Sequence, residues 1–227
     1  MLDKVETAKL LQRDWLILSA EFKIMAMTKI NCDQTNGIQG LEWNEHIRLR
    51  SEMYIGKVGD GTDPEDGIYT LLKGLIECSI SEFKQGVAKD LEIDFSGLTV
   101  SLREYGRGIP LESVVSRTSG LHVGMGAPEG FSTLNGYKVA NAFAEKFLVT
   151  SYRDEKHSWA LYAKGVLFNH GIEEDKGQEP MGTWVQFNLD TELFPGSYYR
   201  LEIVRDIVRQ YAKDNPGFSI YLHVEKL

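Results

Sequence analysis

Apolar residues recur at helical spacing in the middle of the chain. From Asp63-Pro64 onward they fall every three or four positions, which predicts a long amphipathic helix that begins there, because proline is tolerated in a first turn. The same spacing predicts a second amphipathic helix over residues 201–213. The apolar stripe of the long helix consists of Ile68, Leu71, Leu72, Leu75, Ile76, Ile80 and Phe83.

Alternation of apolar and polar residues predicts two strands, over residues 91–95 and 99–103, and other apolar segments resemble further strands. Between the first two strands, Ser96-Gly97 is predicted as a hairpin turn. The acidic stretch from Gly171 to Gly182 is predicted as a solvated loop. Helices and strands in this order favour a layered α/β sandwich. The predicted strands cover residues 91–95, 99–103, 147–152, 158–162, 183–188 and 219–224.

The first forty residues differ from the rest of the chain. They carry a rough helical stripe of apolar side chains, followed by a polar stretch over residues 31–39. The apolar run over residues 15–18 is too short to cross a bilayer, and the absence of a basic start argues against a signal peptide. We predict an N-terminal extension over residues 1–40 and one domain over residues 41–227. The stripe consists of Leu2, Val5, Leu10, Leu11, Trp15, Leu18 and Phe22.

Composition and charge narrow the class of protein. A chain of 227 residues with 42% hydrophobic and 26% charged residues suits one soluble globular domain with its own core. The net charge of -8 argues against an isolated nucleic-acid binder, which needs a basic face to displace counterions. Cys32 and Cys78 form no disulfide framework, which favours a reduced, cytoplasmic setting. The five histidines are scattered and show no metal-site spacing.

The segment Glu104–Pro110 carries the strongest chemical signal. It reads Glu-Tyr-Gly-Arg-Gly-Ile-Pro and follows a predicted strand, which Gly-Ile-Pro cannot continue. Its two glycines let a ligand come close to the backbone, while Glu104 can direct a carboxylate into a pocket. The pattern predicts a shaped corner at the edge of a binding site.

This segment and several others, in the same order, resemble the GHKL ATPases, and among them the ATP-binding domains of the B subunits of topoisomerase IV and DNA gyrase. The resemblance runs from about Leu41 to Tyr221. In the resembled proteins the segment before this domain forms an arm that reaches over the partner protomer, so residues 1–40 are expected to be either such a dimerisation arm or a helix packed on its own domain. It implies an α+β fold, a two-layer sandwich of the GHKL (Bergerat) type whose mixed sheet is covered by helices on one face. In the resembled proteins a second domain and a metal-binding cleavage domain follow, and we expect neither in this chain. The other matching segments are 45–56, 59–69, 134–142, 182–187 and 215–217.

Two positions of the implied ATP-site helix lack the chemistry of the family. The resemblance places Gly74 where the family has the glutamate that activates water, and Cys78 where it has the asparagine that holds magnesium. Glycine cannot accept a proton, and a thiol is a poor ligand for a hard cation that prefers oxygen. We therefore expect no catalytic residue and no metal ligand, and no hydrolysis by the mechanism of the family.

Two glutamates of the same helix are assigned different roles. Glu77 is a candidate for a relocated base, but it lies three positions from Gly74 and points off the ligand-facing line of the helix. Glu82 is expected to form a structural pair with Arg107, because both match paired residues in the resembled proteins.

The phosphate-binding segment is also altered. In the resembled family, closely spaced glycines hold the triphosphate with backbone N–H groups at a helix N-terminus. Here only Asn135 and Gly136 match, and Tyr137 follows directly, which corresponds to a two-residue deletion. We expect Tyr137 to place its bulk where the backbone should approach phosphate.

The adenine end of the implied site keeps more of the pattern. Glu104 stands where the family has an aspartate that accepts from the adenine amino group, and Thr183 matches the threonine that assists it. Such residues either bind adenine weakly without magnesium or persist because the corner shapes the sheet. The residual nucleotide-binding candidates are Glu104, Arg107, Gly108, Ile109, Pro110, Asn135, Gly136 and Thr183.

Three functions remain open from the sequence. The first is a catalytically degenerate homologue that needs no cofactor and acts through contacts with itself or with a topoisomerase B-type subunit. The second is a domain that binds ATP and changes conformation without turnover. The third is a working topoisomerase ATPase whose site has been rebuilt around ATP and magnesium. We expect no membrane partner and find no strong nucleic-acid signal.

Overall fold

The computed structural model describes residues 41–120, 135–175 and 179–224. Within the chain, Leu41–Leu227 is one structural unit. The predictions for residues 1–40, and residue 134 of the matching segment 134–142, lie outside the described residues.

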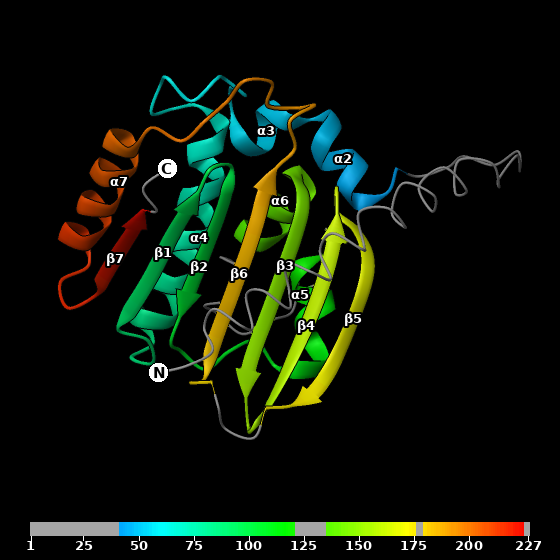
Figure 1. Cartoon of the computed structure of the whole chain (residues 1–227), viewed down its shortest axis with the longest axis vertical. Helices are drawn as coiled ribbons and strands as arrows, with labels where there is room; N and C mark the ends of the chain where they lie inside the picture. The colour runs from blue at the N-terminus through cyan, green and yellow to red at the C-terminus, as the bar shows by residue number, and fades with distance from the viewer. Residues whose placement is uncertain (1–40, 121–134, 176–178, 225–227) are drawn as a thin grey trace, which may run out of the picture. The chain divides into compact units, whose positions relative to one another are not determined.

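The helices gather on one face of a sheet (Figure 1). The longest of the described helices, α4 (Gly67–Lys84), carries the predicted apolar stripe, and Leu72, Leu75 and Ile76 on this stripe are at most 1% exposed. The predicted second amphipathic helix is confirmed as α7 (Leu201–Asp214). The other helical elements are α2 (Trp43–Leu49), α3 (Ser51–Ile55), the 3-10 turn η1 (Leu111–Ser113), α5 (Val114–Thr118) and α6 (Asn135–Phe143).

The described residues form a seven-stranded sheet in the order β5-β4-β3-β6-β2-β1-β7. Strand β7 runs parallel to β1, and the other neighbouring strands are antiparallel, so the predicted mixed sheet is confirmed. The strands are β1 (Asp90–Ser96), β2 (Thr99–Glu104), β3 (Ala144–Arg153), β4 (Lys156–Ala163), β5 (Val166–Glu174), β6 (Gly182–Leu189) and β7 (Ser219–Val224).

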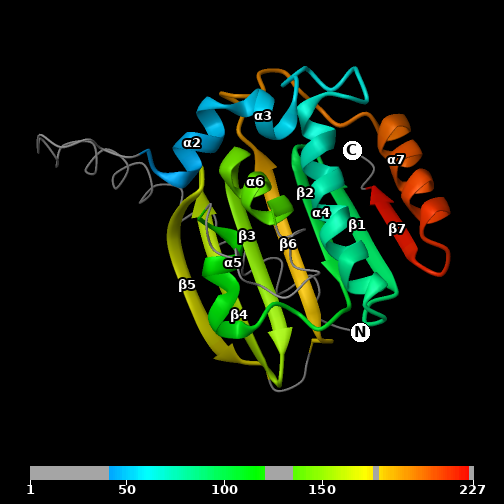
Figure 2. The ribbon, with the colours of Figure 1, turned by 180° about the vertical axis from the view of Figure 1, so that it is seen from behind.

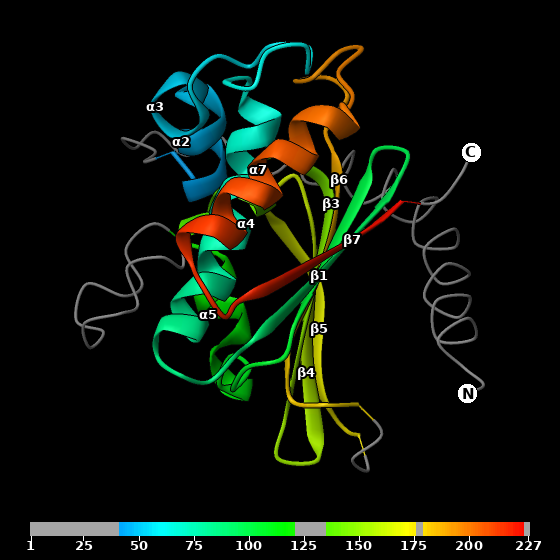
Figure 3. The same ribbon diagram turned by 90° about the vertical axis from the view of Figure 1, so that its left-hand side faces the viewer.

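The molecule has two layers, as the sequence predicts. Seen from behind, α4, α5 and α6 lie in front of the strands (Figure 2), and the edge-on view shows these helices and α7 on the same side of the sheet (Figure 3). The core lies between the layers, where Phe147 of β3 and Phe187 of β6 are fully buried beside the apolar face of α4. Burying each such side chain contributes about 1.5–3 kcal/mol to folding.

The long helix begins later than the sequence indicates. It starts at Gly67, whereas Pro64 lies in a turn that the backbone N–H of Asp66 closes on the carbonyl oxygen of Asp63 (3.0 Å). The buried carboxylate of Asp66 accepts hydrogen bonds from the backbone N–H groups of Gly61 (2.9 Å) and Asp63 (3.2 Å). These hydrogen bonds satisfy backbone N–H groups of the loop before the helix, so the helix begins only at Gly67.

Two predictions about the sheet need correction. The hairpin turn consists of Gly97 and Leu98, because Ser96 still pairs with Thr99; Gly97 supplies the positive φ of 60°. The loop predicted from Gly171 to Gly182 is wrong for its first residues, since Gly171–Glu174 belong to β5 and pair with β4. As an edge strand with mostly exposed side chains, β5 lacks the apolar alternation that marks a strand in sequence.

Candidate functional site

Glu104 and Thr183 meet because they are cross-strand partners in the antiparallel pair of β2 and β6. Each is only 3% exposed. The Glu104 carboxylate accepts a hydrogen bond from the backbone N–H of Gly106 (2.6 Å), and the Thr183 hydroxyl hydrogen-bonds to it as well. Burial raises the pKa of Glu104 above its ordinary value, although these hydrogen bonds limit the rise. The site therefore contains a buried carboxylate beside a hydroxyl.

The corner after Glu104 is held by close contacts with neighbouring elements. A Cβ at Gly106 would lie 2.5 Å from the carboxylate of Glu104, so a larger residue there would force that carboxylate to move. Gly108 has a φ of 70°, and its backbone approaches Ser151 of β3. The Ser151 hydroxyl donates to the carbonyl oxygen of Ile109 (2.7 Å). Both glycines thus serve the fold of the chain itself.

The predicted pair of Glu82 and Arg107 is confirmed. The Arg107 guanidinium donates two hydrogen bonds to the Glu82 carboxylate, from Nε (3.0 Å) and from Nη2 (2.8 Å). It also donates to the side chain of Gln85 (2.7 Å). The pair fastens the corner to the last turns of α4 and engages the guanidinium of Arg107 in doing so.

Helices α4 and α6 cross at two glycines. A Cβ at Gly136 would lie 2.2 Å from the carbonyl oxygen of Gly74, and a Cβ at Gly74 would lie 3.3 Å from the Cα of Gly136. The backbone of α6 therefore occupies the space into which a side chain at position 74 would project. A general base at this position would require the two helices to separate.

The thiol of Cys78 lies in the same crossing. It is 5% exposed and donates to the carbonyl oxygen of Gly74 (3.3 Å). Burial raises the pKa of Cys78 to about 12, while the backbone N–H groups of Tyr137 and Gly136, which face the sulfur, act in the opposite direction. The thiol is consequently neutral at neutral pH, and the first N–H groups of α6 are directed at it.

Glu77 points toward α7. Its side chain is exposed, and its carboxylate accepts a hydrogen bond from the hydroxyl of Tyr211 (2.8 Å). The residues of α4 that face the buried crossing, Gly74 and Cys78, lie on another side of the helix. The structure thus places Glu77 as the helical spacing predicts. Its partner Tyr211 was not foreseen, since the only signal for that residue is its position on the predicted helix.

Tyr137 lies deeper than the sequence predicts. Its side chain is 6% exposed, and it lines a small cavity together with Glu104 and Thr183. The Thr183 hydroxyl hydrogen-bonds to the Tyr137 phenol as well as to Glu104. The cavity that remains is only about 10 Å³, which is room for a single water-sized sphere. The ring therefore fills the space beside the carboxylate instead of the phosphate end.

The structure brings only part of the predicted site together. Besides Tyr137, the cavity is lined by Leu75, Ser79, Leu102, Glu104, Thr183 and Val185. Glu104 and Thr183 are thus the two predicted residues that share it, and the lining by Ser79 was not foreseen. The candidates Arg107, Gly108, Ile109, Pro110 and Gly136 do not line this cavity, and the side chain of Asn135 lies outside the described part of the chain.

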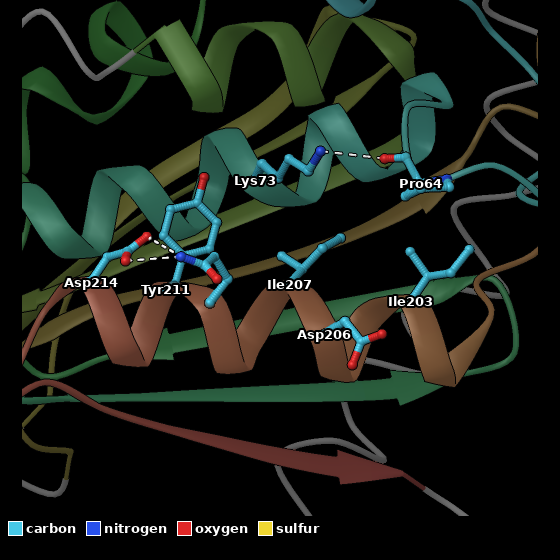
Figure 4. A pocket seen from close by; sticks show the side chains of 8 residues that line it. Pro64, Lys73, Ile203, Asp206, Ile207, Tyr211 and Asp214 are labelled. Carbon is cyan, nitrogen blue, oxygen red and sulfur yellow. Dashed lines mark hydrogen bonds between the residues drawn. The ribbon is translucent and has the colours of Figure 1, made fainter.

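A larger hollow lies between α4 and α7 (Figure 4). It encloses about 510 Å³ and is open to solvent, and Ile203, Ile207 and Tyr211 of α7 point into it. The ammonium group of Lys73, from α4, donates to the carbonyl oxygen of Pro64 (3.3 Å). This hollow offers a hydrophobic floor and no convergent set of acid and base groups.

Across residues 41–120, 135–175 and 179–224, no cluster of three or more histidine, cysteine, aspartate or glutamate side chains is arranged to hold a metal ion. Over the same residues, no helix has the length and apolar character needed to cross a membrane.

Comparisons with known proteins point to one group. The chain is 41% identical over 182 residues to the B subunit of DNA topoisomerase 4 from Borreliella burgdorferi, a match that covers 78% of this chain and 30% of that protein. It is 28% identical over 218 residues to the B subunit of the type 2 topoisomerase of Aquifex aeolicus, covering 84% of this chain and 25% of that protein. The chain thus spans less than a third of the length of these relatives. No family model matches it.

A solved structure shows the same fold. The 43K ATPase domain of Thermus thermophilus gyrase B, determined in complex with an aminocoumarin, superposes with a TM-score of 0.70 at 24% sequence identity. The match covers 81% of this chain and 49% of that one. The predicted two-layer α+β architecture is confirmed by this likeness.

Proposed function

Because the chain belongs to the GHKL ATPase domains of type IIA topoisomerase B subunits, we propose that it is a non-hydrolysing member that acts through protein contacts. In this proposal the domain requires neither ATP nor magnesium. Its partner is a second copy of itself or a topoisomerase B-type subunit, in the cytoplasm.

The crossing of α4 and α6 carries the proposal. The positions that the family uses for its base and its magnesium ligand are Gly74 and Cys78, and the backbone of α6 at Gly136 fills the space beside them. A neutral, buried thiol neither binds a hard cation nor accepts a proton from water. Restoring that chemistry would need a different packing of two helices, not only one different side chain.

A base relocated to Glu77 has little support from the geometry. The Glu77 carboxylate is engaged by Tyr211 of α7, away from the buried crossing. A general base must come within about 3 Å of the water it activates, directly or through one further water. We therefore assign Glu77 to the contact between two helices.

The test is phosphate release by the purified chain with ATP and magnesium, run beside Glu77→Gln as the matched variant. We expect no release above the buffer blank from either protein. Release by the parent chain that Glu77→Gln abolishes would overturn the proposal and establish a relocated base.

Association is tested separately by light scattering on the purified chain and by co-purification of the tagged chain with the topoisomerase B subunits of its native cells. We expect a dimer or a stable complex. A monomeric mass together with no captured topoisomerase partner would count against action through protein contacts, even if hydrolysis is absent.

A second candidate function is ATP binding without turnover. It is favoured by one observation, the persistence of the buried Glu104 carboxylate beside the Thr183 hydroxyl. Calorimetric titration with a non-hydrolysable ATP analogue, with and without magnesium, separates the two. Binding of the analogue supports the second candidate, and no heat at millimolar ligand supports the first.

A further inference from the structure

We propose that the ring of Tyr137 fills the space in which the resembled family holds an adenine ring, so that the intact chain excludes this ring and removal of the Tyr137 side chain exposes the pocket. The inference deepens the proposed function, because it explains how the domain keeps the shape of a ligand site without a ligand. It rests on that function in one respect, namely that the intact chain takes up no nucleotide.

The position of Tyr137 indicates that its ring fills the pocket and is more than one of the residues around it. The residue comes from the first turn of α6, whose N-terminal N–H groups contact Cys78 of α4. From there the side chain enters the space beside Glu104 and Thr183 and leaves a cavity of only about 10 Å³. The Thr183 hydroxyl hydrogen-bonds both to the phenol hydroxyl of Tyr137 and to the Glu104 carboxylate.

The walls of the pocket define the class of ligand. Leu75, Leu102 and Val185 supply apolar surface, and each is at most 4% exposed. Glu104 offers an acceptor for an amino group, and the neighbouring Thr183 hydroxyl can donate to a ring nitrogen. A flat aromatic ring that carries an amino group satisfies both, and adenine is a suitable probe.

Emptying the pocket creates space of the right size. Replacing a buried aromatic ring by a methyl group leaves a cavity that the surroundings fill only in part. An apolar cavity of about 150 Å³ is known to take up benzene. A ring-sized cavity with a carboxylate and a hydroxyl at one end should accept a polar heteroaromatic ring at that end.

A second buried tyrosine provides the matched control. Tyr162 of β4 is fully buried, and its hydroxyl lies 2.8 Å from the hydroxyl of Thr118. It therefore shares with Tyr137 both burial and a threonine partner. Within the described part of the chain, the groups that hydrogen-bond to the Tyr162 hydroxyl are hydroxyls and backbone, with no carboxylate among them.

The experiment measures thermal unfolding of the parent chain, Tyr137→Ala and Tyr162→Ala, each alone, with adenine and with p-cresol. Both variants should lose about 10 °C in Tm, because a buried ring is removed. p-Cresol should restore part of the Tm of both. Adenine at about ten times its Kd should raise the Tm of Tyr137→Ala alone, by roughly 3–5 °C.

Adding Glu104→Leu to Tyr137→Ala tests the acceptor, because leucine has no oxygen that could accept from an amino group. It should abolish most of the shift with adenine while keeping the shift with p-cresol. The proposal is overturned if adenine stabilises the parent chain as much as the variant, or if p-cresol stabilises Tyr137→Ala and adenine does not. Where Tyr137→Ala fails to fold, Tyr137→Val takes its place, and the absence of any adenine shift in that variant overturns the proposal equally.

The two proposals fail in different ways. Phosphate release or binding of the ATP analogue by the parent chain refutes the absence of nucleotide uptake. If adenine does not raise the Tm of Tyr137→Ala, only the proposal that Tyr137 fills the pocket is refuted. The proposed non-hydrolysing function is then unaffected.

Discussion

The two ends of the candidate site differ in how their residues pack. At the corner of Glu104–Pro110, glycines and Arg107 still make close contacts with α4 and β3 of the same chain. At the crossing of α4 and α6, two backbones have come together where side-chain chemistry is expected. In the proposed non-hydrolysing domain, the residues that match the family at the corner also hold the fold, whereas the two positions that lack the family's chemistry lie where two helices pack.

The largest effect is expected from a substitution at Gly136. In Gly136→Ala, the added Cβ would lie 2.2 Å from the carbonyl oxygen of Gly74 and 2.6 Å from its carbon. Because both are backbone atoms, α4 and α6 must move apart, and we expect the free energy of unfolding to fall by about 3 kcal/mol. Urea denaturation followed by circular dichroism measures this loss.

Gly74→Ala is the control for that prediction. Its Cβ would lie 3.3 Å from the Cα of Gly136, while alanine favours the helix by about 1 kcal/mol over glycine. These effects oppose each other, so the net change should stay within about 1 kcal/mol of zero. Equal losses in both variants would mean that the crossing is not set by the close approach at Gly136.

At the other end, Glu104→Gln should change how stability depends on pH. Burial, the first cause, raises the pKa of Glu104 above 4.5 in the folded chain, so protonation favours the folded state. The stability that this group contributes is fully present below pH 4.5 and is lost as the pH rises through the folded pKa, with a slope of at most about 1.4 kcal/mol per pH unit.

Glu104→Gln removes this titration, so its stability relative to the parent chain should rise with pH above 4.5. Chemical denaturation at several pH values between about 4 and 8 measures the difference. Asp66 and Asp190 do not interfere, because burial is outweighed by their hydrogen bonds and their pKa values lie below 3.8. Parallel curves for parent and variant would show that Glu104 does not titrate in this range.

The smallest expected effect concerns the pair of Glu82 and Arg107. Its side chains are 21% and 40% exposed, so solvent weakens the attraction, although the two-pronged geometry strengthens it. A double-mutant cycle with Glu82→Ala and Arg107→Ala should give a coupling of about 0.5–1 kcal/mol. The coupling should shrink in roughly 1 M salt. A value indistinguishable from zero would remove the pair from the contacts that hold the corner.

The sequence predicts the layers better than the details of the site. The stripe of α4 and the alternation of β1 and β2 are periodic and therefore visible, and the other predicted strands show as short apolar segments. The edge strand β5 and the turn at Pro64 depend on hydrogen bonds to other segments, which periodicity does not report.

Within the site, the pairing of Glu82 with Arg107 followed from the resemblance. The depth of Tyr137 could not be predicted in this way. It depends on how closely α6 approaches α4. That distance is set by contacts of Gly74 and Cys78 in α4 with Gly136 in α6, and the two helices are far apart in sequence.

The central place of β6 has a consequence for synthesis. The blocks β1–β2 and β3–β4–β5 are each joined by neighbours in sequence, and within the described sheet β6 alone links one block to the other. Both blocks are synthesised before residues 182–189, so the edges of β2 and β3 that pair with β6 lack this partner in the nascent chain. Unpaired edges of this kind are open to wrong partners, and pairing across long chain separations is slow. The domain therefore joins the two halves of its sheet late, once residues 182–189 have emerged.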